Sequence, residues 1–263
     1  MPRFFIDNTA VNGGYAIITG SDARHISLAL RMRVGDGITL CDFSRNEYTC
    51  VIDSITPLEV RAKIKGRTAN STEPPYSAHL FQALPKGDRA DTIVQKSVEC
   101  GVSEIVFFES ERCIAKLREE NAEKKLMRFK SIALEAAKQC GRGIVPQVSF
   151  IGGLQEAVEA MSGGELCFVC YEGDEKGEYP TVKLGRLLDD FEKERIHTGN
   201  QESPVPHDIR FMIGPEGGFS TDEIRKSSEA GLLIAGLGQR ILRCETAAPF
   251  VLSCLSMRYE LCG

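Results

Sequence analysis

The chain has 263 residues, the length of one large domain or of two unequal ones. Hydrophobic residues make up 42% and charged residues 26%, ordinary fractions that exclude a disordered, collagen-like or low-complexity protein. The sequence contains no apolar run of the roughly 18 residues that a membrane span requires, and its start lacks the apolar stretch of a signal peptide. We therefore expect a cytoplasmic protein.

Ten cysteines raise the question of a disulfide framework or a metal site. A chain of this length without a secretion signal is expected to keep its thiols reduced. Cys167 and Cys170 form the only CxxC pair, inside an apolar segment that reads as a buried strand. A zinc knuckle needs a second pair, so we expect core cysteines and no metal site.

The first part of the chain has the pattern of a small β-barrel, with short apolar runs separated by turn residues. The expected strands are 15–19, 37–41, 48–55 and 60–64. A helix over 21–30 interrupts them, and Ser21 and Asp22 provide its N-terminal cap signal. A small polar stretch with two prolines at 68–75 is typical of a linker, which predicts domains at residues 1–72 and 73–263.

The second part alternates strands with helices, which predicts an α/β domain. Most of its strand candidates are continuous apolar runs, as in a parallel sheet that helices cover on both faces. The expected strands are 80–84, 105–108, 166–171, 209–213 and 232–237, and the clearest helices are 88–100 and 121–140. Residues 173–207 give no clear pattern and are expected to form mostly exposed connections.

The charges are unevenly distributed along the chain, whose net charge is −5. Residues 1–72 carry nine Lys and Arg against seven Asp and Glu, whereas the remainder carries 23 against 30. A basic small part joined to an acidic large part suggests that the two parts have different partners.

The first of two glycine-bearing loops follows the expected strand 209–213. It reads Ile213-Gly214-Pro215-Glu216-Gly217-Gly218-Phe219 and leads into a helix, where Ser220 and Glu223 have the spacing of a capping box. Glycines before a helix N-terminus let the backbone approach a ligand closely. Glu216 would repel a phosphate and no P-loop lysine follows, so we expect a ligand that is neutral or positively charged near this loop.

The second loop follows the expected strand 232–237. It reads Leu237-Gly238-Gln239-Arg240-Ile241-Leu242-Arg243-Cys244-Glu245 and opens a helix at Thr246. Its glycines resemble a dinucleotide fingerprint only superficially, because Ile241 stands where the third glycine belongs. Either loop alone could be an ordinary connection between a strand and a helix. As a pair at the carboxyl ends of neighbouring strands, they indicate a ligand site.

These two loops resemble the C-terminal signature of the ribosomal RNA small subunit methyltransferase E family. The resemblance is carried by Gly214-Pro215-Glu216-Gly217-Gly218-Phe219 and by the segment Leu237-Gly238 to Thr246-Ala247. Further matches lie along nearly the whole chain: Arg24-His25, Leu30-Arg31-Met32, Lys86-Gly87-Asp88, Gln95–Glu99, Gly101-Val102, Ser110–Cys113, Gln139–Arg142 and Val145-Pro146. Members of this family methylate N3 of a uridine in 16S ribosomal RNA with S-adenosylmethionine (SAM).

The resemblance implies a PUA-like β-barrel that binds RNA over residues 1–72. It also implies a methyltransferase domain of the SPOUT superfamily over residues 73–263, with a parallel sheet, a trefoil knot near the chain end and a homodimer interface. The apolar last helix, with Phe250, Val251, Leu252, Leu255 and Met257, suits that interface by analogy, although a helix apolar nearly all round is equally a core helix.

The resemblance further implies which residues hold the cofactor. The sulfonium and amino groups of SAM would explain a carboxylate at Glu216. The implied cofactor residues are Tyr171, Glu172, Ile213, Gly214, Pro215, Glu216, Gly217, Gly218, Leu237, Gly238, Ile241, Leu242, Arg243, Thr246 and Ala247.

Methylation of uracil N3 requires removal of an imide proton, which directs attention to the charged residues of the second loop. Arg243 or Arg240 could stabilise the uridine anion through its carbonyl oxygens, and Glu245 could accept the proton or orient an arginine. The alternative is that Arg243 and Glu245 form an ion pair that only fixes the loop.

RNA phosphates are expected to meet basic residues from both domains. The candidates are Arg3, Arg24, His25, Arg31, Arg33, Lys86, Arg112 and Arg142. Each one could equally be a solvated surface charge, and His25 could be an ordinary residue of the barrel. Two other functions remain open: another SPOUT-type RNA methyltransferase, acting on a ribose 2′-hydroxyl or a guanine, and a non-catalytic RNA-binding assembly factor.

Overall fold

A computed structural model describes residues 1–116, 119–173, 178–197 and 208–262. The chain divides into two compact units, the first formed by residues 1–73 and 134–145 and the second by residues 74–133 and 146–263. The exposed connection expected at 173–207 lies partly outside the described residues. No helix of the described ranges has the length and apolar character needed to cross a bilayer.

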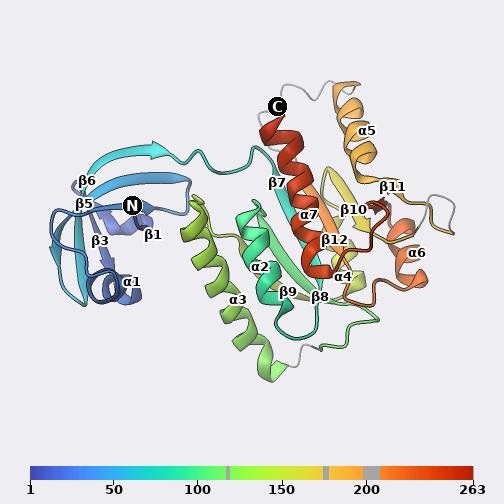
Figure 1. The fold of residues 1–263 in the computed structure, drawn as a ribbon, viewed down its shortest axis with the longest axis horizontal. Coiled ribbons are helices and arrows are strands. Elements are labelled where there is room, and N and C mark those ends of the chain that lie inside the picture. Colours follow the sequence, from blue (N-terminus) through green and yellow to red (C-terminus); the bar gives the residue numbers. More distant parts are fainter. Residues whose placement is uncertain (117–118, 174–177, 198–207, 263) are drawn as a thin grey trace. The chain divides into compact units, whose positions relative to one another are not determined.

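The first unit is built on a curled six-stranded sheet with the order β1-β4-β5-β6-β3-β2 (Figure 1). Only β1 and β4 pair in parallel. Its strands are β1 (Arg3–Phe5), β2 (Val11–Asn12), β3 (Tyr15–Thr19), β4 (Gly37–Cys41), β5 (Asn46–Ile55) and β6 (Glu59–Ala69). The expected helix begins as α1 (Gly20–Arg24) and continues in a wider turn, η2 (His25–Ala29); a short turn, η1 (Asn8–Ala10), precedes β2.

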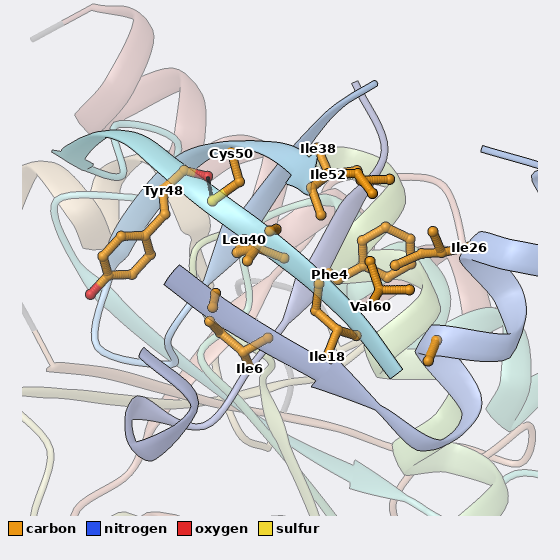
Figure 2. Packing of buried hydrophobic residues seen from close by; sticks show 13 residues of the cluster. Phe4, Ile6, Ile18, Ile26, Ile38, Leu40, Tyr48, Cys50, Ile52 and Val60 are labelled. Carbon is orange, nitrogen blue, oxygen red and sulfur yellow. Dashed lines mark hydrogen bonds between the residues drawn. The ribbon is translucent and has the colours of Figure 1, made fainter. Parts of the chain in front are cut away.

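The alternation of apolar and polar residues along these strands places one side of the sheet on a buried core. Figure 2 shows this core, in which Phe4, Ile38, Leu40 and Ile52 from the strands meet Ile26 from η2. All five side chains are at most 2% exposed. The predicted small β-domain is therefore present.

The second unit contains a seven-stranded sheet with the order β11-β13-β10-β12-β7-β8-β9, in which every pair is parallel. Its strands are β7 (Ser77–Ala83), β8 (Glu104–Glu109), β9 (Gln147–Gly153), β10 (Leu166–Cys170), β11 (Val182–Lys183), β12 (Asp208–Ile213) and β13 (Leu233–Gly236). The helices are α2 (Arg89–Glu99), α3 (Glu119–Cys140), α4 (Leu154–Met161), α5 (Leu184–His197), α6 (Thr221–Glu229), α7 (Cys244–Ser256) and the terminal turn η4 (Met257–Leu261). The predicted parallel sheet flanked by helices is confirmed, whereas the edge strands β9 and β11 were not predicted.

The last helix packs inside its own unit, beside α2 (Figure 1). Val251, Leu252 and Leu255 are fully buried in the chain itself, and Met257 is exposed. Three of the residues expected at a subunit interface therefore belong to the core of the protomer. The homodimer and the trefoil knot stay predictions.

Aromatic contacts hold the loops of the sheet's carboxyl edge on the core. The ring of Phe219, in the loop after β12, stacks on Phe108 near the end of β8, with centroids 6.5 Å apart. Within the sheet, Phe168 of β10 stacks on Phe211 of β12. The contact of Phe219 with Phe108 anchors the glycine-bearing loop at its end closest to α6.

Candidate functional site

A cavity lies at the carboxyl ends of three adjacent parallel strands, β13, β10 and β12. Its volume is about 670 Å³, including the solvent-filled space at its opening. The lining residues come from the loop after each strand and from the beginning of α7: Cys170, Tyr171, Glu172, Ile213, Gly214, Pro215, Gly218, Phe219, Leu237, Gly238, Gln239, Arg240, Ile241, Leu242, Cys244 and Ala247. This is the position at which open parallel sheets bind ligands.

The loop after β12 folds tightly and needs its glycines. The N–H of Gly218 donates to the carbonyl of Pro215 at 3.0 Å, and Gly218 has a φ of +63°. A Cβ at Gly214 would lie 3.3 Å from the backbone of Gly218. Side chains at these positions would fill the space between the two halves of the loop.

The helix after this loop begins with the predicted capping box. The hydroxyl of Ser220 accepts from the N–H of Glu223, and the Glu223 carboxylate accepts from the N–H of Ser220 at 2.9 Å. Ser220 also donates to the carboxylate of Glu111 at 2.6 Å. The loop is thus fixed at the point where it enters α6.

Gln82 holds the same loop through hydrogen bonds to its backbone, a role that the sequence analysis did not predict. This fully buried side chain lies near the end of β7, next to β12 in the sheet. Its amide nitrogen donates to the carbonyl of Gly214 at 3.2 Å and also contacts the carbonyl of Ile213. A polar residue in an apolar strand was the signal that could have revealed it, because buried amides are retained where they satisfy backbone groups.

Glu216 does not line the cavity, and its predicted role beside the cofactor stays a prediction. Its carboxylate accepts from the N–H of Lys86 at 2.9 Å and from the guanidinium of Arg89. Burial alone would raise the pKa of Glu216, but these hydrogen bonds outweigh it and hold the pKa below its usual value. The negative charge of Glu216 is therefore engaged within the chain.

Glu172 supplies the carboxylate that does face the cavity. A Cβ at Gly218 would lie only 2.8 Å from its Oε1, which shows that the Glu172 carboxylate rests against the glycine loop. Glu172, which was also predicted at the cofactor, is therefore an acidic group of the cavity lining that can meet a cationic ligand.

Of the three predicted catalytic residues, only Arg240 lines the cavity. Arg243 is 81% exposed, and its Nη1 lies 3.9 Å from Oε1 of Glu245, so their ion pair is loose. Burial, reinforced by Glu245, raises the pKa of Cys244 to about 12, and this neutral thiol donates to Glu245 Oε2 at 3.3 Å.

Most predicted cofactor residues gather at the cavity, but Gly217, Arg243 and Thr246 do not line it, and neither does Glu216. Gly217 faces outward and its carbonyl accepts from the guanidinium of Arg112 at 2.9 Å. Cys170, Phe219, Gln239 and Cys244 line the cavity without having been predicted. All four lie within or beside the motifs that drew attention to the loops, so proximity in sequence was the available signal.

Two of the predicted RNA-contact residues, Arg142 and Arg3, form ion pairs inside the first unit. Arg142 is 3% exposed and its guanidinium binds the carboxylate of Glu73. The side chain of Arg3 is 15% exposed, 2.9 Å from Oε2 of Glu47 and 2.9 Å from Sγ of Cys41. Both cations are thus paired with a carboxylate of the same unit, and their contact with RNA stays a prediction.

The other basic candidates are exposed. In the first unit, Arg24 and His25 line a shallow hollow together with Leu28 and Leu58. The His25 ring also meets Phe4 edge-on, with centroids 6.3 Å apart. Arg31, Arg33, Lys86 and Arg112 complete the exposed set, and their contact with RNA stays a prediction.

Comparisons with known proteins agree with this architecture. A family described as an RNA methyltransferase domain matches residues 72–256, and a family described as an RNA methyltransferase PUA domain matches residues 18–65. These matches place the sheet, its cavity and the small β-domain in the class of two-part RNA methyltransferases.

Individual relatives match over nearly the full chain. The ribosomal RNA small subunit methyltransferase E of Bacillus subtilis (strain 168) is 32% identical over 265 residues, 99% of this chain and 98% of the relative. The crystal structure of ribosomal RNA small subunit methyltransferase E from Neisseria gonorrhoeae bound to S-adenosyl methionine has a TM-score of 0.80 and 30% identity, with 98% of both chains covered. A Legionella pneumophila structure with bound SAM has the same score and identity, with 97% of both chains covered. The chain belongs to the ribosomal RNA small subunit methyltransferase E family.

Proposed function

We propose that the chain transfers the methyl group of SAM to N3 of a uridine in 16S ribosomal RNA of the small ribosomal subunit. The observation that carries the proposal is the cavity at the carboxyl ends of β10, β12 and β13, whose glycine loops lie beside a cavity-facing carboxylate. Relatives named ribosomal RNA small subunit methyltransferase E, which match nearly the whole chain, support the choice of RNA. A cytoplasmic location follows from this function and stays a prediction.

The cavity suits SAM by shape and by charge. Its glycine-bearing loops leave room for a ligand at the carboxyl ends of the strands, where open parallel sheets bind cofactors. Glu172 offers a negative charge, which complements the amino and sulfonium groups. Bound SAM supplies an activated methyl group.

Arg243 and Glu245 are the proposed chemical groups for the uridine. Arg243 projects from the second loop with 81% of its side chain exposed, so it is free to bind a uracil carbonyl oxygen and stabilise the anion. The Glu245 carboxylate is the proposed acceptor of the N3 proton, because its contacts with Arg89 and Arg243 are long, at 3.7 and 3.9 Å, and leave it only loosely paired. Arg240, at the wall of the cavity, can orient the base or a phosphate.

The direct test is methyl transfer from labelled SAM to small ribosomal subunits and to free 16S RNA, both isolated without the modification. Nucleoside mass spectrometry should find 3-methyluridine at one position. A methylated ribose or guanine would contradict the proposed target while leaving methyl transfer intact. Binding of RNA without SAM binding or methyl transfer would indicate an assembly factor.

A further inference from the structure

Arg89 stands between two carboxylates that belong to the two cavity loops. It is the first residue of α2, and its guanidinium contacts Glu216 in the loop after β12. Its Nε also lies 3.7 Å from Oε1 of Glu245, at the beginning of α7. One side chain from a third element thus links the loop after β12 to the helix after the second loop.

The position of Arg89 is not explained by the helix that carries it. A cation in the first turn of a helix meets the positive end of the helix dipole, which disfavours it. Gly87, with a φ of +68°, turns the chain so that the N–H of Lys86 and the guanidinium of Arg89 approach the same oxygen of Glu216. The carboxylates of Glu216 and Glu245 offset the unfavourable interaction of Arg89 with the helix dipole. The position of Arg89 is therefore explained by its contacts with the two loops and not by the helix.

The link also affects the proposed catalytic pair. Arg243 approaches Glu245 only to 3.9 Å, whereas Arg89 provides a second positive charge at 3.7 Å. Because Glu245 has this second counter-charge, Arg243 does not have to remain with it. Arg243 can therefore turn towards the substrate without leaving Glu245 unpaired.

We propose that Arg89 is a positioning residue that ties the loop after β12 to the beginning of α7, through Glu216 and Glu245, and frees Arg243 for the RNA. This rests on the proposed function of the cavity. A simple surface ion pair would contribute little to stability and nothing to turnover.

The test compares Arg89→Ala, Arg89→Lys and Glu216→Gln with wild type and with Arg128→Ala as a matched control. Arg128 forms an ion pair with Asp91 on the same helix α2 and does not touch the cavity loops. Two quantities are measured for each folded variant: the Kd of SAM by calorimetry, and the single-turnover rate of methyl transfer at saturating SAM and RNA.

We expect Arg89→Ala to weaken SAM binding and to slow single-turnover transfer by about tenfold or more each, because small misplacements of a site are costly. Arg89→Lys should recover part of both losses, since its ammonium can still reach Glu216. Combining Arg89→Ala with Glu216→Gln should add little to the single loss, because both act through one contact. Arg128→Ala should behave as wild type.

Wild-type affinity and rate in folded Arg89→Ala would overturn the proposal. If Arg89→Ala does not fold, Glu216→Gln decides instead, and unchanged values for that variant overturn it. A wild-type protein that transfers no methyl group contradicts the proposed function, and the SAM affinities of the variants alone then decide the role of Arg89.

Discussion

The guanidinium of Arg142 pairs with the carboxylate of Glu73, with Nη2 and Oε2 2.7 Å apart and only 4% of each side chain exposed. The same carboxylate accepts from the N–H groups of Gly143 and Ile144. Residues 69 positions apart are therefore joined by a buried, fully hydrogen-bonded charge pair within the first unit. Removing one partner would leave the other charge buried and unpaired.

Arg142→Ala should therefore lower the free energy of unfolding of the first unit by about 3–5 kcal/mol. Urea denaturation followed by circular dichroism measures the loss. The control is Arg67→Ala, which removes an exposed arginine of the same unit whose guanidinium binds Asn46. Equal stability of the two variants would mean that burial of the Arg142 pair has no energetic consequence.

The same pair predicts a dependence of stability on pH. Burial alone would raise the pKa of Glu73, but the hydrogen bonds from Arg142 and from the two N–H groups lower it below the usual value of 4.5. A carboxyl whose folded pKa is lowered stabilises the protein above its unfolded pKa, and this contribution disappears as the pH falls through the folded pKa. The stability difference between wild type and Glu73→Gln should therefore be largest near neutral pH and shrink below about pH 4.5. A difference that stays constant down to pH 3 would contradict this assignment.

The local pattern of the sequence was sufficient for the sheet and for the loops. Continuous apolar runs such as 105–108 and 166–171 predicted parallel strands inside the sheet, because both of their faces are buried. Glycines and a capping box predicted the turn into α6, since those signals act over a few residues. β11 has two residues and is exposed, so it carries no such signal.

Contacts between distant residues could not be predicted in the same way. Glu216 was expected at the ligand because a carboxylate suits the sulfonium and amino groups of SAM, and its partner Arg89 lies 127 residues earlier in the chain. Arg142 follows the end of a helix and reads as an exposed cation until the fold brings Glu73 to it. In both cases the partner lies far away in the sequence, so no local pattern could indicate the ion pair.

Gly218→Ala should weaken SAM binding more than the added backbone strain can explain. The substitution places a Cβ 2.8 Å from Glu172 Oε1 and so displaces the carboxylate that faces the cavity. Gly231→Ala is the matched control, since Gly231 also has a positive φ, +89°, but no atom lies within 4 Å of its Cβ position. Both variants should lose about 1–2 kcal/mol of stability from the left-handed backbone. Calorimetry should show a raised Kd of SAM for Gly218→Ala alone, and equal Kd values would exclude the role given to Glu172.

Arg243→Ala should keep the fold and lose about a hundredfold or more of the methyl-transfer rate, as expected for loss of one electrostatic stabiliser. Its side chain is 81% exposed and makes only a loose ion pair, so little stability depends on it. Arg186→Ala is the control, because Arg186 is 79% exposed and lies 3.6 Å from Asp190 in a comparable loose pair on α5. A single-turnover assay with small subunits distinguishes the two variants. Unchanged turnover in Arg243→Ala would remove this residue from the mechanism.

RNA binding by the first unit should depend on Arg24 and Arg33 and not on Arg61 and Arg67, which are also exposed but are engaged with neighbouring side chains. Arg24 and Arg33 are exposed and are candidates for phosphate contacts, whereas Arg61 lies over the ring of Tyr15 and Arg67 binds Asn46. Each lost contact with single-stranded RNA should reduce the slope of log K against log salt concentration by about 0.7, because one fewer counterion is released. The double variant Arg24→Ala/Arg33→Ala should therefore bind small-subunit RNA with a slope lower by about 1.4.

The double variant Arg61→Ala/Arg67→Ala removes the same charge from the same unit and should retain nearly the wild-type slope. Fluorescence anisotropy over a series of salt concentrations measures both variants. If the two variants lower the slope equally, overall charge governs binding rather than the surface that carries Arg24 and Arg33. If neither changes it, the RNA contacts of this protein lie outside these residues, and the exposed Lys86 and Arg112 of the second unit become the next candidates.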